Sequence, residues 1–111
     1  MAYFDRVRFI ETPLFTAAVR TVCSEASFRA LQLSLVLQPD RGPIIRGSGG
    51  LRKLRWAGSG RGKRGGIRVI YHWYPTEETI LLLYLYPKNV AEDLTPSQLR
   101  ILRRLVEEEL E

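Results

Sequence analysis

Apolar and polar residues follow two different rhythms along the chain, and each rhythm predicts a type of element. From Tyr3 to Glu11 the apolar residues alternate loosely, which predicts a first strand. From Leu14 to Val22, and again from Phe28 to Leu37, they recur at steps of three and four residues. That spacing predicts two amphipathic helices. Thr12, followed by a proline, and Ser24 are the expected hydroxyl caps of these helices.

The second half of the chain predicts three consecutive strands and a last helix. After a glycine-rich loop up to Gly50, strand-forming segments run from Leu51 to Ala57, Ile67 to Tyr74 and Thr79 to Tyr86. The last of these is nearly all apolar, which is typical of a central strand covered on both faces. The run TPSQ, beginning at Thr95, combines a capping box with a proline at the first helical position. The resulting β-α-α-β-β-β-α order predicts one α+β domain over residues 1–111, a small antiparallel sheet with a helical hairpin and a C-terminal helix.

The positive charge is concentrated in one stretch of the sequence. The 111 residues include 17 Lys or Arg and 12 Asp or Glu, for a net charge of +5. Nine of the basic residues and none of the acids lie between Arg41 and Thr76. Strand alternation places Lys53 and Arg55 on one face and Arg52 on the other. A basic surface with Trp and Tyr among its charges predicts contact with phosphates.

Several classes of chemistry are disfavoured by the residues that the chain lacks. Cys23 has no intrachain partner, and no Cys/His cluster has metal spacing, so we expect no metal, no cofactor and a reducing, cytoplasmic setting. The stretch from Gly58 to Gly66 has no GK[ST] signature and joins two strands, which argues against a P-loop. Charges interrupt the N-terminal residues and the longest apolar run is short, so we expect neither a signal peptide nor a membrane span. His72 is expected to be structural or exposed.

The basic hairpin is the remaining candidate for function. If the strands pair in order, Lys53, Arg55 and Arg68 converge on one face of the sheet, joined by Tyr86 and Lys88 from the last strand and its turn. Such a face is either a basic surface that binds a nucleic-acid backbone or an acidic partner without catalysis, or an active site. The glycine-rich loop supplies further cations that are suited to gripping RNA. The expected RNA-binding residues are Arg52, Arg61, Lys63 and Arg64.

The segments GGLRKLRW, GGIRVIYHW and LLYLYPKNVAEDLTPSQLRILRRLVEE resemble the RelE/ParE superfamily of bacterial toxins, and most closely its HigB-like branch. The resemblance implies a toxin of a type II toxin–antitoxin system that cuts messenger RNA in the ribosomal A site without a metal. In that reaction the ribose 2′-OH attacks the adjacent phosphate, so a base, cations for the phosphorane and an acid for the leaving oxygen are needed. The implied partners are the ribosome, messenger RNA and a cognate antitoxin, HigA-like with a helix-turn-helix domain.

The resemblance also assigns roles to individual residues. Lys53 and Arg55 match the family's paired basic residues on the second strand, Arg68 the arginine that begins the third, and Lys88 the basic position after the last strand. Arg68 is the expected phosphate clamp, Lys53 or Arg55 the base or second clamp, and Lys88 the group on the leaving side. Tyr86 could replace a tyrosine that some RelE members carry on the C-terminal helix. Two alternatives are a ParE-like toxin that binds DNA gyrase and a non-catalytic RNA- or ribosome-binding module.

Overall fold

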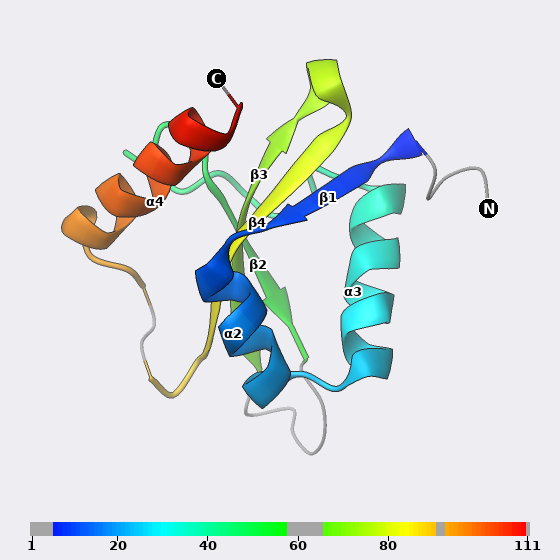
Figure 1. Cartoon of the computed structure of the whole chain (residues 1–111). Coiled ribbons are helices and arrows are strands. Elements are labelled where there is room, and N and C mark those ends of the chain that lie inside the picture. Colours follow the sequence, from blue (N-terminus) through cyan, green and yellow to red (C-terminus); the bar gives the residue numbers. More distant parts are fainter. Residues whose placement is uncertain (1–5, 58–65, 91–92, 111) are drawn as a thin grey trace.

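A four-stranded sheet separates a helical hairpin from the C-terminal helix (Figure 1). The computed structural model describes residues 6–57, 66–90 and 93–110. The order of elements is the predicted one, and the α+β class is confirmed. The elements are β1 (Arg8–Glu11), α2 (Pro13–Val22), α3 (Glu25–Leu37), β2 (Arg52–Trp56), β3 (Ile67–Tyr74), the short 3-10 helix η1 (Pro75–Glu77), β4 (Thr79–Pro87) and α4 (Pro96–Leu110).

Capping side chains set the starts of the three helices, as the sequence predicts. The Thr12 hydroxyl accepts a hydrogen bond from the Phe15 N–H at 3.0 Å, and Ser24 caps α3 in the same way at 3.1 Å. At α4 the capping box is reciprocal. Thr95 accepts from the Gln98 N–H at 3.1 Å, and the Gln98 side chain accepts from the Thr95 N–H at 2.8 Å. These bonds satisfy backbone donors that the first turn of a helix leaves without partners.

The sheet has the strand order β1-β4-β3-β2, so β4 is an interior strand, as predicted. The β2–β3 and β3–β4 pairs are antiparallel and form the expected meander. β1 pairs with β4 in parallel, which makes the sheet mixed and corrects the expectation of a purely antiparallel one. β1 is also shorter than predicted, because it begins at Arg8; residues 3–5 of the predicted strand lie outside the described residues.

Each face of the sheet has its own apolar core. On one face, Phe15 of α2 and Leu31 of α3 pack with Leu82 of β4, and all three are 0% exposed. On the other face, α4 contributes Leu102 and Val106. Figure 1 shows α4 and the α2–α3 hairpin apart from each other, with the sheet between them. Among the helices that the structure describes, none has the length and apolar composition needed to cross a membrane.

A β-bulge in β4 decides which side chains face α4. In the β3–β4 ladder, Tyr71 pairs with Leu82 and the adjacent Ile70 pairs with Tyr84. Leu83 is therefore an extra residue in β4. Leu82 packs on the α2–α3 side, whereas Tyr84 and Tyr86 pack on the α4 side. Regular alternation from Leu82 would have placed both tyrosines on the α2–α3 side. The bulge therefore moves them onto the face that carries the strand cations.

Candidate nucleic-acid interface

Three neighbouring strands present a row of cationic and aromatic side chains on the α4 face. Arg55 of β2 pairs with Arg68 of β3, and Arg68 pairs in turn with Tyr86 of β4. Residues paired directly across adjacent strands project from the same face, so these three lie side by side. Lys53 lies two positions before Arg55 on the same face. We call Lys53, Arg55, Arg68 and Tyr86 the cation row; it unites four of the five predicted catalytic residues.

The members of the cation row differ in their access to solvent. Arg55 is exposed, and the Lys53 side chain is 22% exposed. Arg68 and Tyr86 are each only 3% exposed. The Tyr86 ring lies against that of Tyr84, with ring centroids 5.8 Å apart. Arg68 and Tyr86 therefore form the floor of the site, and Lys53 and Arg55 are the cations that a ligand meets first.

Lys88 borders the cation row where β4 ends. Its backbone N–H donates to the Gly66 carbonyl at 3.0 Å, which holds this turn beside the start of β3. Gly66 also adjoins the floor of the site, because a Cβ there would lie 3.8 Å from Nη1 of Arg68. The Lys88 side chain is exposed. The fifth predicted catalytic residue is thus at the rim of the site and not in the row itself.

The predicted RNA-binding residues are not brought together with the cation row in the described part of the chain. Arg52 lies on the opposite face of β2, and its Nη1 donates to the carbonyls of Asp40 and Gly42 at 3.3 and 2.7 Å. Those two hydrogen bonds anchor the loop that precedes β2. The loop cations Arg61, Lys63 and Arg64 lie outside the described residues.

An acid that the sequence analysis did not single out lies among the cations. Nζ of Lys53 donates to Oδ1 of Asp93 in an ion pair. This hydrogen bond and the charge of Lys53, with a smaller contribution from Arg68, lower the pKa of Asp93. The carboxylate therefore stays ionised at neutral pH. The only signal in the sequence was an acid in the turn after Lys88, which is also what an ordinary solvated turn contains.

An open groove of about 450 Å³ adjoins Lys53 and Asp93. One wall comes from the loop before β2 and includes Ile44 and Ile45. The other includes Leu94, which precedes α4, and Leu99 in the first turn of that helix. Tyr86 contributes to the floor. The groove is therefore largely apolar and runs directly into the charged part of the site.

Tyr71 holds the loop that forms the first wall of this groove. Its hydroxyl donates to the Pro39 carbonyl at 2.7 Å and accepts from the Gly42 N–H at 2.9 Å. Tyr71 is 0% exposed, and burial raises the pKa of its hydroxyl. Close packing leaves no room for a side chain at Gly42, where a Cβ would lie 2.9 Å from the Lys53 carbonyl oxygen. A buried residue on one face of the sheet thus fixes a loop that serves the other.

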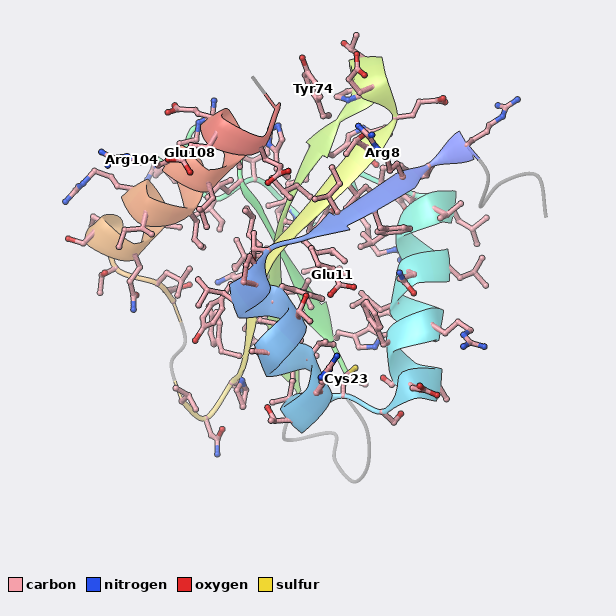
Figure 2. All side chains as sticks on the ribbon, in the orientation of Figure 1. Arg8, Glu11, Cys23, Tyr74, Arg104 and Glu108 are labelled. Carbon is pink, nitrogen blue, oxygen red and sulfur yellow. The ribbon has the colours of Figure 1, made fainter. Side chains whose placement is uncertain are left out.

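The remaining titratable candidates lie away from the cation row. His72 is partly buried on the α4 face, where burial and then the charge of Arg103 lower its pKa. Cys23 lies where α2 turns into α3 (Figure 2) and packs against the core on the other face. In the described part of the chain, no three His, Cys, Asp or Glu residues are grouped so that they could hold a metal ion. The cation row is therefore the main candidate for a functional site in the described part of the chain.

Comparison with solved structures identifies this architecture, although no family model matches the sequence. The structure is similar to that of a mutant of the E. coli toxin RelE in the free state, in which two arginines are replaced by alanine. The TM-score is 0.56 at 12% identity, over 78% of this chain and 88% of that one. The chain has the RelE-like fold.

A second RelE structure agrees with the first. The archaeal RelE–RelB complex from Pyrococcus horikoshii OT3 gives a TM-score of 0.52 at 22% identity, over 78% of this chain and 99% of that one. Both likenesses concern the fold, because both identities are low. Neither separates a HigB-like branch from other RelE-like proteins, so that subdivision stays a prediction.

Proposed function

We propose that this protein is the toxin of a type II toxin–antitoxin pair and that it cuts messenger RNA on the ribosome. The observation that carries the proposal is the cation row on a RelE-like sheet. Several cations on one face offer an RNA phosphate more than one charge-assisted donor. All four members of the row are on strands, which hold side chains in the fixed geometry that proton transfer needs.

The proposed reaction divides its tasks among these residues. The ribose 2′-oxygen forms a bond to phosphorus and the bond from phosphorus to the 5′-oxygen breaks, which leaves a cyclic phosphate and a 5′-OH. Arg68 and Arg55 hold the phosphate oxygens as negative charge builds up on them. Lys53, once its ammonium has given up a proton to solvent, takes the proton of the 2′-OH, because the guanidinium of an arginine stays protonated and is a poor base. Lys88 and Tyr86 lie on the leaving side, where one of them gives a proton to the 5′-oxygen.

The groove beside Lys53 favours the interpretation that the ligand is a nucleic acid and not a small anion. Proteins that recognise RNA often bind unstacked bases in apolar surroundings next to their phosphate contacts. Here Ile45 and Leu99 line opposite walls of the groove, and Lys53 lies in it. A nucleotide whose phosphate is held by the cation row has an apolar space for its base close by.

An antitoxin is the proposed protein partner, and the cytoplasm the proposed location. The archaeal RelE was solved in complex with RelB, which supports a protein partner of that kind for this chain. We extend the proposal to a HigA-like antitoxin with a helix-turn-helix domain. The ribosome and messenger RNA complete the set of partners. Because the contacts with RNA are largely ionic, binding should weaken steeply as salt is raised.

Primer extension on messages from cells that make the protein tests this function. Wild type should produce ribosome-dependent cuts, and Arg68→Ala should reduce them about a hundredfold, as expected when a donor to the transition state is removed. Arg104→Ala removes an exposed arginine from α4 instead and should cut normally (Figure 2). Because Arg68 is buried, each variant should first be shown to be folded by circular dichroism. Arg55→Ala repeats the test at an exposed position.

The same experiment separates the alternatives. Toxicity with intact messages and inhibited DNA supercoiling would indicate a ParE-like gyrase inhibitor. If messages stay intact and supercoiling is not inhibited, but RNA binding is retained, the protein would be a non-catalytic RNA- or ribosome-binding module. Either result would overturn the proposal of a nuclease.

A further inference from the structure

Asp93 lies among cations that the proposed function assigns to RNA. It belongs to the segment between the end of β4 and the start of α4, and its carboxylate accepts a hydrogen bond from Lys53. The charges of Lys53 and Arg68 both act on this carboxylate and favour its ionised form. A carboxylate and a phosphate oxygen offer the same chemistry to such cations, since both are anionic and accept hydrogen bonds only.

The position of Asp93 makes it the movable part of this arrangement. Arg68 is 3% exposed, so a phosphate can reach it only after neighbouring groups shift. The Asp93 side chain is 71% exposed, and it is carried by a connecting segment and not by a strand. The next residues are fixed, because Leu94 packs against the core under α4 and Thr95 caps that helix. A rotation of one exposed side chain is therefore enough to release Lys53.

We propose that Asp93 occupies the phosphate position in the free protein, and that RNA binds by exchanging a backbone phosphate for this carboxylate. The inference rests on the proposed RNA-binding function and adds to it an internal competitor at the same site. The competitor is weak, because an exposed ion pair changes an equilibrium by only about two- to fivefold. Asp93 thus lowers the affinity of the site for any phosphate, but RNA can still displace its carboxylate.

Fluorescence anisotropy with a labelled 2′-O-methyl RNA heptamer measures the exchange without cleavage, because this probe lacks the 2′-OH nucleophile. Asp93→Asn should bind the heptamer about two- to fivefold more tightly than wild type. Glu108→Gln is the matched control: it also replaces one exposed acid by its amide, but on α4 (Figure 2). This control should stay within about 1.5-fold of wild type, since solvent and salt largely screen the charge of an exposed acid.

A second background distinguishes direct competition from a general change in charge. In Lys53→Gln protein the ion pair is already absent, so adding Asp93→Asn should give little further gain. The same comparison with inorganic pyrophosphate, followed by calorimetry, should show the same order of affinities without any RNA. Equal affinities of Asp93→Asn and Glu108→Gln would overturn the inference. Weaker binding by Asp93→Asn would also overturn it, because Asp93 would then itself contact RNA.

The failure of this inference and the failure of the proposed function give different results. If messages are cut but Asp93→Asn binds like Glu108→Gln, the nuclease stands and the competitor does not. If no message is cut but Asp93→Asn gains affinity for pyrophosphate, the competitor stands and the nuclease does not. If no variant binds either probe, both fall.

Discussion

The two faces of the sheet are built from alternate residues of the same strands, yet they have become very different surfaces. Under α2 and α3, the strand residues Leu54, Val69 and Leu82 are at most 6% exposed and form one apolar core. On the opposite face, apolar residues lie under α4, but Arg55 and Arg68 take the positions beside Leu54 and Val69. One face is mainly an apolar core, and the other combines an apolar core with a cationic site.

The difference between the faces follows from how far the helices extend over them. Two helices cover the first face, so a charge at the centre of that face would be buried without water. A single helix, α4, covers the second, and its Leu102 packs in one apolar cluster with Leu83 of β4. On this face, Lys53 and Arg55 keep contact with solvent while their strand holds them in place. Partial cover thus allows charge and rigidity in the same strand.

Breaking the covered face should have the largest effect on folding. Leu82→Ala should lower the free energy of unfolding by about 3 kcal/mol, because it removes buried methyl groups and leaves a cavity. Leu82 is 0% exposed, whereas the control Leu37→Ala changes a side chain that is 62% exposed and should cost less than about 0.5 kcal/mol. Urea denaturation measures both. Equal losses in the two variants would show that this face is not the stabilising one.

Tyr71→Phe tests whether the covered face also supports the open one. Removing the hydroxyl leaves the Gly42 N–H and the Pro39 carbonyl without this partner, and should cost about 1–2 kcal/mol of unfolding free energy. Hydrogen exchange at the Gly42 amide should accelerate, because the loop that walls the groove is loosened. Tyr74→Phe, at the turn end of β3 (Figure 2), is the control and should change neither value. An unchanged exchange rate at the Gly42 amide would show that the covered face does not support the groove on the open face.

Arg55→Ala should alter the open face without altering the fold. Loss of one contact with single-stranded RNA should reduce the slope of log affinity against log salt by about 0.7, because fewer counterions are released. The free energy of unfolding should stay within about 0.5 kcal/mol, since Arg55 is exposed. Arg29→Ala, an exposed arginine on α3, should leave both quantities unchanged. A slope equal to that of wild type would remove Arg55 from the interface.

The smallest expected effect concerns His72, on the α4 face. Its pKa in the folded protein lies below the ordinary 6.5, so the unfolded chain binds more protons between the two values. The free energy of unfolding should therefore fall as the pH drops below 6.5, and level off below the folded pKa. His72 is the single histidine of the chain, so His72→Gln should flatten this part of the curve. Parallel curves for the two proteins would exclude His72 as the cause.

Local signals in the sequence determined most of the elements. Thr12, Ser24 and Thr95 each cap the helix predicted for them, because a capping bond joins residues only three positions apart. Strand alternation also placed Lys53 and Arg55 correctly on one face, since that rule needs only the strand itself. The fold class followed from these elements and their order.

Long-range pairing decided what local signals could not. The parallel pairing of β1 with β4 joins residues about seventy positions apart, such as Arg8 and Thr79, and nothing near either residue encodes it. The pairing of Lys53 with Asp93 likewise depends on how α4 returns to the sheet. The burial of Arg68 could not be predicted from the sequence either, because an arginine at the start of a strand is usually exposed.

The sequence by itself determined the helices, the strands, the meander and the concentration of cations, because each depends on neighbours along the chain. The tertiary structure alone decided which side chains meet. The bulge at Leu83 is the clearest case. Because β4 is nearly all apolar there, its sequence has no alternation of polar and apolar residues to show where side chains switch from one face of the sheet to the other. Only pairing with β3 sets that point, and it places Tyr86 beside Arg68 on the face that carries the proposed function.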